Sequence, residues 1–162
     1  MMELLTEALK FIFPAYCANA VPVIAGGGHP IDFGRKFFDG KPVFGRNKTI
    51  RGFIFGLTAG TTVGLLESAF YNYPTPFGLL LSLGALLGDL TGAFLKRRLG
   101  IPPGGLLPII DQIDFVAGAL LLALPLQILN LNLGITVLII TPPIHLLTNY
   151  AAYKLGLKSN PW

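Results

Sequence analysis

The chain has 162 residues, enough for one domain, and 52% of them are hydrophobic while only 12% are charged. A mean hydropathy of +0.65 is more than a soluble core requires, so composition excludes an ordinary soluble protein and indicates an integral membrane protein. The formal net charge of +4 favours anionic partners such as lipid headgroups and nucleotides. A single cysteine, Cys17, leaves no intramolecular disulfide.

Five segments are long and apolar enough to cross a bilayer, which takes about 20 residues each. In chain order they are Leu4–Ala25, Ile50–Tyr71, Pro76–Leu95, Ile109–Leu129 and Leu131–Tyr153. The sequence therefore predicts an all-α integral membrane protein with five transmembrane helices. The first segment is not expected to be a secretory signal, because Glu3 and Glu7 stand where such a signal is positively charged.

The basic residues predict the orientation of these spans. Eleven of the twelve lysines and arginines fall between the first and second spans, between the third and fourth, or after the fifth. Five spans place all three segments on one side, and the positive-inside rule makes that side the cytoplasm. The N-terminus is then outside and the C-terminus cytoplasmic, with Trp162 and the Tyr150–Tyr153 pair expected to anchor the chain at the cytoplasmic interface.

The connection between the first two spans, residues 26–49, is expected to be a cytoplasmic loop. Its phenylalanines argue against disorder and favour a segment that rests on the bilayer surface, with Arg35 and Lys36 at the headgroups. Where the loop meets the second span, a helix start offers free backbone N–H groups to an anion. The residues at this helix start suit phosphate binding, but they do not have the spacing of the Walker phosphate-binding motif. They are Arg46, Lys48, Thr49 and Arg51.

Glycines recur at every fourth position in the second and third spans, at Gly52–Gly64 and at Gly84–Gly92. Small residues at this spacing let helix backbones approach closely in lipid. We expect these faces to be packing seams that join the second span to the third.

The most informative residues are three aspartates, Asp89, Asp111 and Asp114, which lie within or beside apolar spans. An ionisable group at membrane depth costs roughly 2.5–3.5 kcal/mol, so such groups usually face a polar cavity. Spacing of seven aligns Asp89 with Ser82 and Lys96 on the third span. The other two aspartates share one face at the start of the fourth span, because they are three residues apart.

The two spans that carry these aspartates meet across a short turn, so the three carboxylates are predicted to converge on one pocket just below the cytoplasmic surface. Oxygen ligands suit Mg²⁺, which completes its shell with substrate phosphates. Lys96 and Arg97 would supply the counter-charge for those phosphates. The residues thus predict a membrane site for cations and phosphates.

Structural roles remain open for each of these residues. Asp89 could be a buried partner of Lys96, and Asp111 or Asp114 could cap the fourth span or pair with Arg97. Asn19 lies near two prolines of the first span, which bend a helix and leave backbone carbonyls without a partner. Its side chain could bond such a carbonyl or enter a site. His145 and Asn149 lie one turn apart on the fifth span and could form an interhelical bond or enter the site.

The stretch from Gly88 to Asp114 resembles the signature of the CTP-dependent phosphatidate cytidylyltransferases, the CDP-diacylglycerol synthases. That signature has a serine, a Lys-Arg pair, a glycine-containing turn, a proline and a closing Asp-x-x-Asp. These correspond here to Ser82, Lys96 with Arg97, Gly104 with Gly105, Pro108, and Asp111 with Asp114. The Lys-Arg pair falls later than in the bacterial pattern. Neither a Lys-Asp step before the turn nor a Gly-His-Gly-Gly stretch after the proline is found.

In these departures and in its short length, the chain resembles the archaeal branch of the family, the CDP-archaeol synthases. This likeness covers nearly the whole chain, from Asn19 through Gly45–Gly52 to the Pro143-Ile-His145…Asn149 end. It implies one membrane-embedded catalytic domain over residues 1–162 that moves CMP from CTP to 2,3-di-O-geranylgeranyl-glycerol 1-phosphate, releases pyrophosphate and depends on Mg²⁺. The implied partners are CTP, an isoprenoid glycerol-phosphate lipid and membrane lipids, with no nucleic acid.

The resemblance assigns roles to the residues singled out above. Catalysis would fall to Asp89, Asp111, Asp114 and Lys96, and the three aspartates would also hold the metal. Substrate binding would fall to Asn19, Lys48, Thr49, Arg51, Arg97, His145 and Asn149. The implied location is the cell membrane, with a multi-pass chain and a cytoplasmic active site. Two alternatives stay open, a small membrane transporter of an ion or phosphate compound and the same chemistry on an ester-linked phosphatidate.

Overall fold

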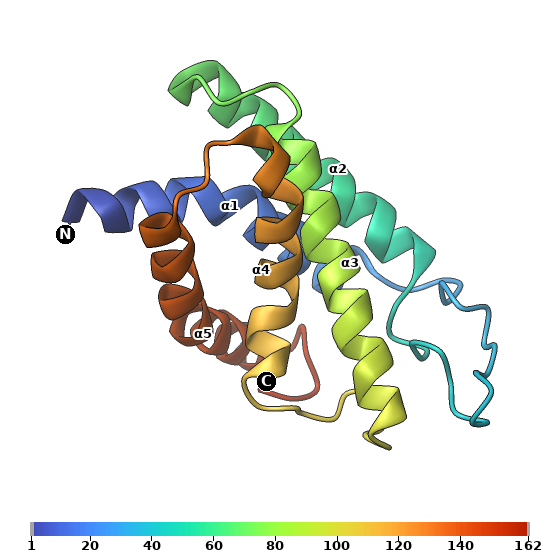
Figure 1. The fold of residues 1–162 in the computed structure, drawn as a ribbon. Coiled ribbons are helices and arrows are strands. Elements are labelled where there is room, and N and C mark those ends of the chain that lie inside the picture. The colour runs from blue at the N-terminus through green and yellow to red at the C-terminus, as the bar shows by residue number, and fades with distance from the viewer. Residues whose placement is uncertain (1, 162) are drawn as a thin grey trace.

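The computed structural model describes residues 2–161, which are helical apart from their loops and two isolated β-bridges. The elements in order are α1 (Met2–Ala25), α2 (Ile50–Tyr71), α3 (Phe77–Arg98), α4 (Ile110–Ala123), the 3₁₀ turn η1 (Leu124–Leu126) and α5 (Leu131–Lys154). In Figure 1, α3 and α4 lie side by side at the centre, α2 packs beside α3, and α5 lies beside α4. The predicted all-α class is confirmed. Trp162 lies outside the described residues.

Four helices of the described chain, α1, α2, α3 and α5, are long and apolar enough to cross a membrane. The fourth predicted span is wrong in its extent, because α4 has only 14 residues. At 1.5 Å per residue it is about 21 Å long, whereas a bilayer core is about 30 Å thick. Pro125 lies in the 3₁₀ turn that follows, and Gln127 then reverses the chain with a φ of 55°. Asn130 caps α5 by accepting a hydrogen bond from the amide of Leu133.

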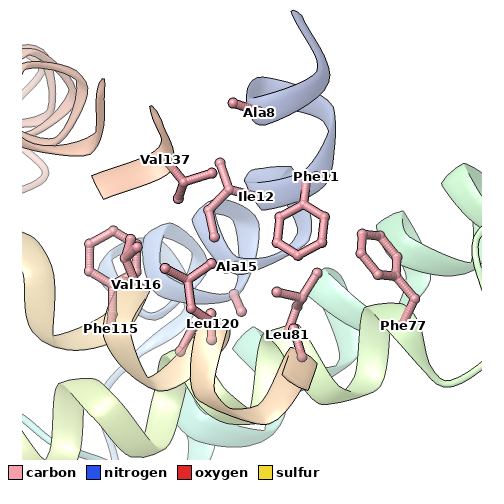
Figure 2. Close-up of a cluster of buried hydrophobic side chains, with 14 of the residues drawn as sticks. Ala8, Phe11, Ile12, Ala15, Phe77, Leu81, Phe115, Val116, Leu120 and Val137 are labelled. Carbon is pink, nitrogen blue, oxygen red and sulfur yellow. The ribbon is translucent and has the colours of Figure 1, made fainter. Parts of the chain in front are cut away.

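The core joins α1 to α3, α4 and α5 (Figure 2). Phe11 of α1 packs edge-on against Phe77 of α3, with 5.6 Å between ring centroids. Val116 of α4 and Val137 of α5 are fully buried on the other side of α1. Many outward-facing side chains are large and apolar, as in Ile139, which is 67% exposed. Such faces suit contact with lipid tails rather than with water.

The glycine seam of α2 packs against α3 as expected, but it also packs against α1, and the seam of α3 has α4 as its partner. Gly56 and Gly60 of α2 lie against α1, so a Cβ on either would clash with backbone atoms of α1. The same row also meets α3, where Gly60 lies against the Ser82 side chain and Gly64 against the backbone of Gly78. The seam of α3 faces α4, and a Cβ at Gly88 would collide with the backbone of Asp114. Small residues predict close helix approach but not which helix approaches.

The loop of residues 26–49 is built from turns and is fastened to the end of α3. Arg98 donates to Asp39 Oδ1 at 2.6 Å and to the carbonyl of Pro42. Its guanidinium also lies between the rings of Phe37 and Phe94, 4.9 and 4.8 Å from their centroids. The segment expected at the bilayer surface is built from turns, and Phe38 at its tip is 99% exposed.

Candidate active site

One end of the bundle forms a cavity of about 580 Å³ whose wall combines the five α-helices, loop 26–49, the α3–α4 loop and the stretch after α5. In Figure 1 this is the end where α3 stops, α4 begins and the described chain finishes. Ten of the eleven predicted site residues line it. They are Asn19, Lys48, Thr49, Asp89, Lys96, Arg97, Asp111, Asp114, His145 and Asn149.

Lys48 reaches into this cavity from the loop and pairs with Asp89 of α3. Its Nζ lies 2.7 Å from Oδ1 and 2.6 Å from Oδ2 of that carboxylate. The backbone beside Lys48 is held by a short antiparallel pairing, in which the amide of Ile31 donates to the Lys48 carbonyl at 2.8 Å. Thr49 then caps α2, accepting from the amide of Gly52 at 3.1 Å. Lys48 is therefore positioned by both the loop and the helix start.

Asp32 braces the loop from inside and was not identified from the sequence. Its side chain is only 7% exposed, and its two oxygens accept from the amides of Gly34, Phe44 and Gly45 at 2.9–3.0 Å. Burial acts to raise the pKa of Asp32, but the three backbone hydrogen bonds outweigh it and hold that pKa below its usual value. An Asp two residues before a Gly is a local turn signal that sequence reasoning can use.

Replacing Asp32 with Asn is expected to loosen the loop, because an amide presents N–H donors to at least one of the three backbone N–H groups. Leaving a buried donor unsatisfied costs about 1–3 kcal/mol. Since the folded-state pKa is depressed, the wild-type brace is intact above about pH 4 and is lost as pH falls through that folded value. Hydrogen exchange at Phe44 and Gly45 should accelerate in Asp32→Asn at neutral pH and in wild type only in acid. Equal protection in both proteins at neutral pH would contradict the assignment.

Lys96 and Asp111 form a second ion pair, from α3 to the start of α4. Lys96 Nζ lies 2.8 Å from Asp111 Oδ1 and also donates to the carbonyl of Gly105 at 3.1 Å. The other carboxylate oxygen of Asp111 accepts from the amide of Leu107 at 3.0 Å. This pair closes the α3–α4 loop against the cavity.

Asp114 can lie close to α3 because the α3 residues that face it are glycines, which have no side chains. A Cβ at Gly92 would overlap the Asp114 carboxylate, and Gly88 meets its backbone. The glycine seam thus lets α4 approach closely enough for Asp114 to line the same cavity as Asp89.

Arg97 is the least exposed charged residue of the cavity wall, at 4%. Within residues 2–161, its Nε and Nη1 are buried and have no hydrogen-bond acceptor. A buried guanidinium with unsatisfied donors is costly unless an anion completes its shell. Arg97 is therefore well suited to receive a carboxylate or phosphate that enters the cavity.

His145 and Asn149 of α5 line the cavity and contact each other, as their spacing predicts. The Asn149 amide lies 3.1 Å from His145 Nε2. The Asn149 oxygen accepts from Lys158 Nζ at 2.9 Å. Lys158 belongs to a stretch after α5 that the sequence analysis did not assign to the site.

One predicted site residue lies outside the cavity wall. Arg51 does not line the cavity, because it lies two positions beyond the cap of α2, is exposed, and sits 5.7 Å from the ring of Phe55. Ser82 shares its helix line with Asp89 but is fully buried against α2, where it would touch a Cβ at Gly60. Thr49 lines the cavity while its hydroxyl is engaged as a helix cap.

The donor set of the cavity fits a hard cation in kind, because three carboxylates line it and Mg²⁺ prefers oxygen ligands. In the arrangement seen here, however, lysines occupy two of those carboxylates. Over residues 2–161, no three Asp, Glu, His or Cys side chains lie close enough together to hold a metal ion. A cation would bind only after the two ammonium groups move away from Asp89 and Asp111.

The fold and the cavity define a membrane-embedded helical protein with a polar site at one end of its bundle. A family model described as CarS-like CDP-archaeol synthase matches residues 1–162. Among relatives, the CDP-archaeol synthases of Pyrococcus furiosus and Thermococcus gammatolerans are each 46% identical; the alignments cover 99% and 96% of this chain and 100% and 95% of theirs. That of Methanococcus aeolicus is 44% identical over 100% of this chain and 99% of its own.

A solved structure, described as an intramembrane enzyme for archaeal membrane lipids biosynthesis, has a similar fold. Its TM-score is 0.82 at 36% identity, covering 90% of this chain and 94% of that one. The chain belongs to the CDP-archaeol synthase family. It is therefore an enzyme, a CTP-using transferase, and the transporter alternative is set aside.

Proposed function

We propose that this protein transfers CMP from CTP to the phosphate of 2,3-di-O-geranylgeranyl-glycerol 1-phosphate, forming a CDP-lipid and pyrophosphate. The observation that carries the proposal is Arg97, a buried guanidinium with unsatisfied donors in a cavity that also holds two Lys–Asp pairs. Such a cavity offers several cations to a polyphosphate at the edge of the apolar bundle. Family membership supports the same reaction.

The reaction needs positioning and charge stabilisation rather than a covalent enzyme intermediate. An oxygen of the lipid phosphate attacks the α-phosphorus of CTP, and the bond from that phosphorus to the bridging oxygen of pyrophosphate breaks. The nucleophile is already an anion, so no general base is required. Lys48, Lys96 and Arg97 would hold the phosphates, and the two lysines would exchange a carboxylate for a phosphate as the substrates enter.

We further propose that Asp89, Asp111 and Asp114 hold Mg²⁺ when CTP is bound. The ion would supply Lewis-acid neutralisation of the triphosphate charge. Release of Lys48 from Asp89 and of Lys96 from Asp111 would free both carboxylates for this role, and Asp114 lines the same cavity from α4.

The lipid tails would lie against the apolar outer faces of the helices, while the cavity opens to the cytoplasm. This orientation is inferred from loop 26–49, the end of α3 and the stretch after α5, which surround the cavity and carry most of the lysines and arginines. Activated nucleotide is made in the cytoplasm, so this side also gives CTP direct access.

The orientation predicts which positions a membrane-impermeant thiol reagent can reach. With Cys17 replaced by Ala, a cysteine at Lys36 should react only in inverted vesicles, and one at Thr75 only in intact cells. Both positions are exposed, and they belong to the loop 26–49 and the α2–α3 turn at the opposite end. Labelling of the two positions from the same side would contradict this topology.

The proposed reaction is tested by incubating purified protein with CTP and either the ether-linked lipid phosphate or an ester-linked phosphatidate. Mass spectrometry should find the CDP-ether lipid, and EDTA should abolish its formation. Faster conversion of the ester lipid would change the proposed substrate, and undiminished turnover in EDTA would remove Mg²⁺ from the proposal.

A further inference from the structure

The last described residues, 155–161, turn back and form part of the cavity wall. Gly156 adopts a φ of 73°, in the left-handed region that favours glycine, directly after α5 ends. The amide of Leu157 donates to the carbonyl of Ala152 at 2.9 Å and fixes this reversal. Farther on, the side chain of Asn160 donates to the carbonyl of Gly104 at 3.4 Å, joining the tail to the α3–α4 loop.

Lys158 lies on the inner side of this tail. Its ammonium group is oriented by Asn149, which in turn contacts His145, so its position is set by α5. Burial, followed by the charges of Lys48 and Lys96, lowers the pKa of Lys158. The three ammonium groups therefore repel one another across the cavity, and an anion bound between them would relieve that repulsion.

The charges of the cavity wall also favour an anion with several charges. Basic side chains exceed carboxylates by two, with Arg46, Lys48, Lys96, Arg97 and Lys158 against Asp89, Asp111 and Asp114. Lys48 and Lys96 each neutralise one carboxylate in the arrangement seen here. A triphosphate has three phosphate groups and can contact more of these five basic side chains at once than a monophosphate can.

We propose that Lys158 binds the triphosphate of the nucleotide, which makes the tail 155–161 part of the nucleotide site. The proposal rests on the proposed function, since it takes CTP as the substrate. Lys158 enters the cavity from the tail, which is joined to the α3–α4 loop, whereas Lys48 enters it from loop 26–49. We expect its contact to affect CTP and to leave the lipid phosphate unaffected, because the charge excess of the wall favours the anion with more phosphate groups.

The test compares CTP and CMP binding by calorimetry in detergent, without lipid substrate, in wild type, Lys158→Met and a control. Lys154→Met is the control, because Lys154 lies four residues earlier over the ring of Tyr150 and does not line the cavity. We expect Lys158→Met to weaken CTP binding at least about tenfold and CMP binding less than about twofold. Lys158→Arg should restore most of the CTP affinity, and the KM for CTP should rise while the KM for lipid stays constant.

Each outcome decides a separate point. Wild-type protein that binds no CTP and forms no CDP-lipid contradicts the proposed function itself. Normal wild-type activity together with unchanged CTP binding in Lys158→Met contradicts only the role of Lys158. Equal losses for CTP and CMP would show that the side chain merely shapes the cavity. Lys158→Gln, which keeps an N–H donor for Asn149, provides the same comparison if the methionine variant does not fold.

Discussion

Turnover is expected to be lost when Asp111 or Asp114 is replaced by Asn. Each change removes one negative charge from the cavity but keeps an oxygen that can accept the hydrogen bond from Leu107 or Phe115. If these carboxylates hold a cation against the triphosphate, kcat should fall by at least about 100-fold. Steady-state kinetics with CTP and lipid phosphate measure the effect.

The matched control is Glu3→Gln, which removes a carboxylate of the same charge from the exposed first turn of α1. All three variants should insert and purify as wild type does, and only Glu3→Gln should keep its activity. Near-wild-type kcat in both aspartate variants would contradict the carboxylate assignment.

The second large effect is expected at Lys48, and the structure separates it from its neighbour Arg51. Lys48→Met removes an ammonium group that lies in the cavity, whereas Arg51→Met removes a charge from the outer surface of α2. The loss of a positioned charge at the reacting phosphates costs about 100- to 1,000-fold in kcat. Arg51→Met should change kcat by less than about threefold, since exposed charges are screened within about 10 Å.

Arg35→Met serves as a further comparison from the exposed part of the same loop, and it should chiefly raise the KM for lipid. Kinetics that vary CTP and lipid separately distinguish the three variants. If Arg51→Met were the most damaging, the phosphate site would have to be moved to the outer face of the α2 start.

Much of the site could be predicted because its signals are local. Three carboxylates in apolar segments require a polar surrounding, and helical periodicity places Asp111 and Asp114 on one face. The prediction that Asp89 shares their cavity needed only the short turn between two spans. The bounds of α2 were predicted as they stand, since Thr49 is a strong cap and Asn72 ends the helix in a left-handed conformation.

Other features could not be predicted because tertiary contacts decide them. The glycines of α3 predicted close packing, but only the folded chain shows that α4 is the partner and that Gly92 makes room for Asp114. Hydropathy continued through Pro125, so the early end of α4 was missed. Lys158 follows the last apolar segment and gives no pattern, because its place in the cavity depends on the chain reversal at Gly156.

The central claim is that the cavity joins the α-phosphate of CTP to a lipid phosphate. It is tested most directly by incubating the purified protein and lipid phosphate with CTP labelled at either the α- or the γ-phosphate. The account predicts that the α-label appears in the lipid product and the γ-label in pyrophosphate. Transfer of the γ-label to lipid, or no transfer of the α-label, would contradict it.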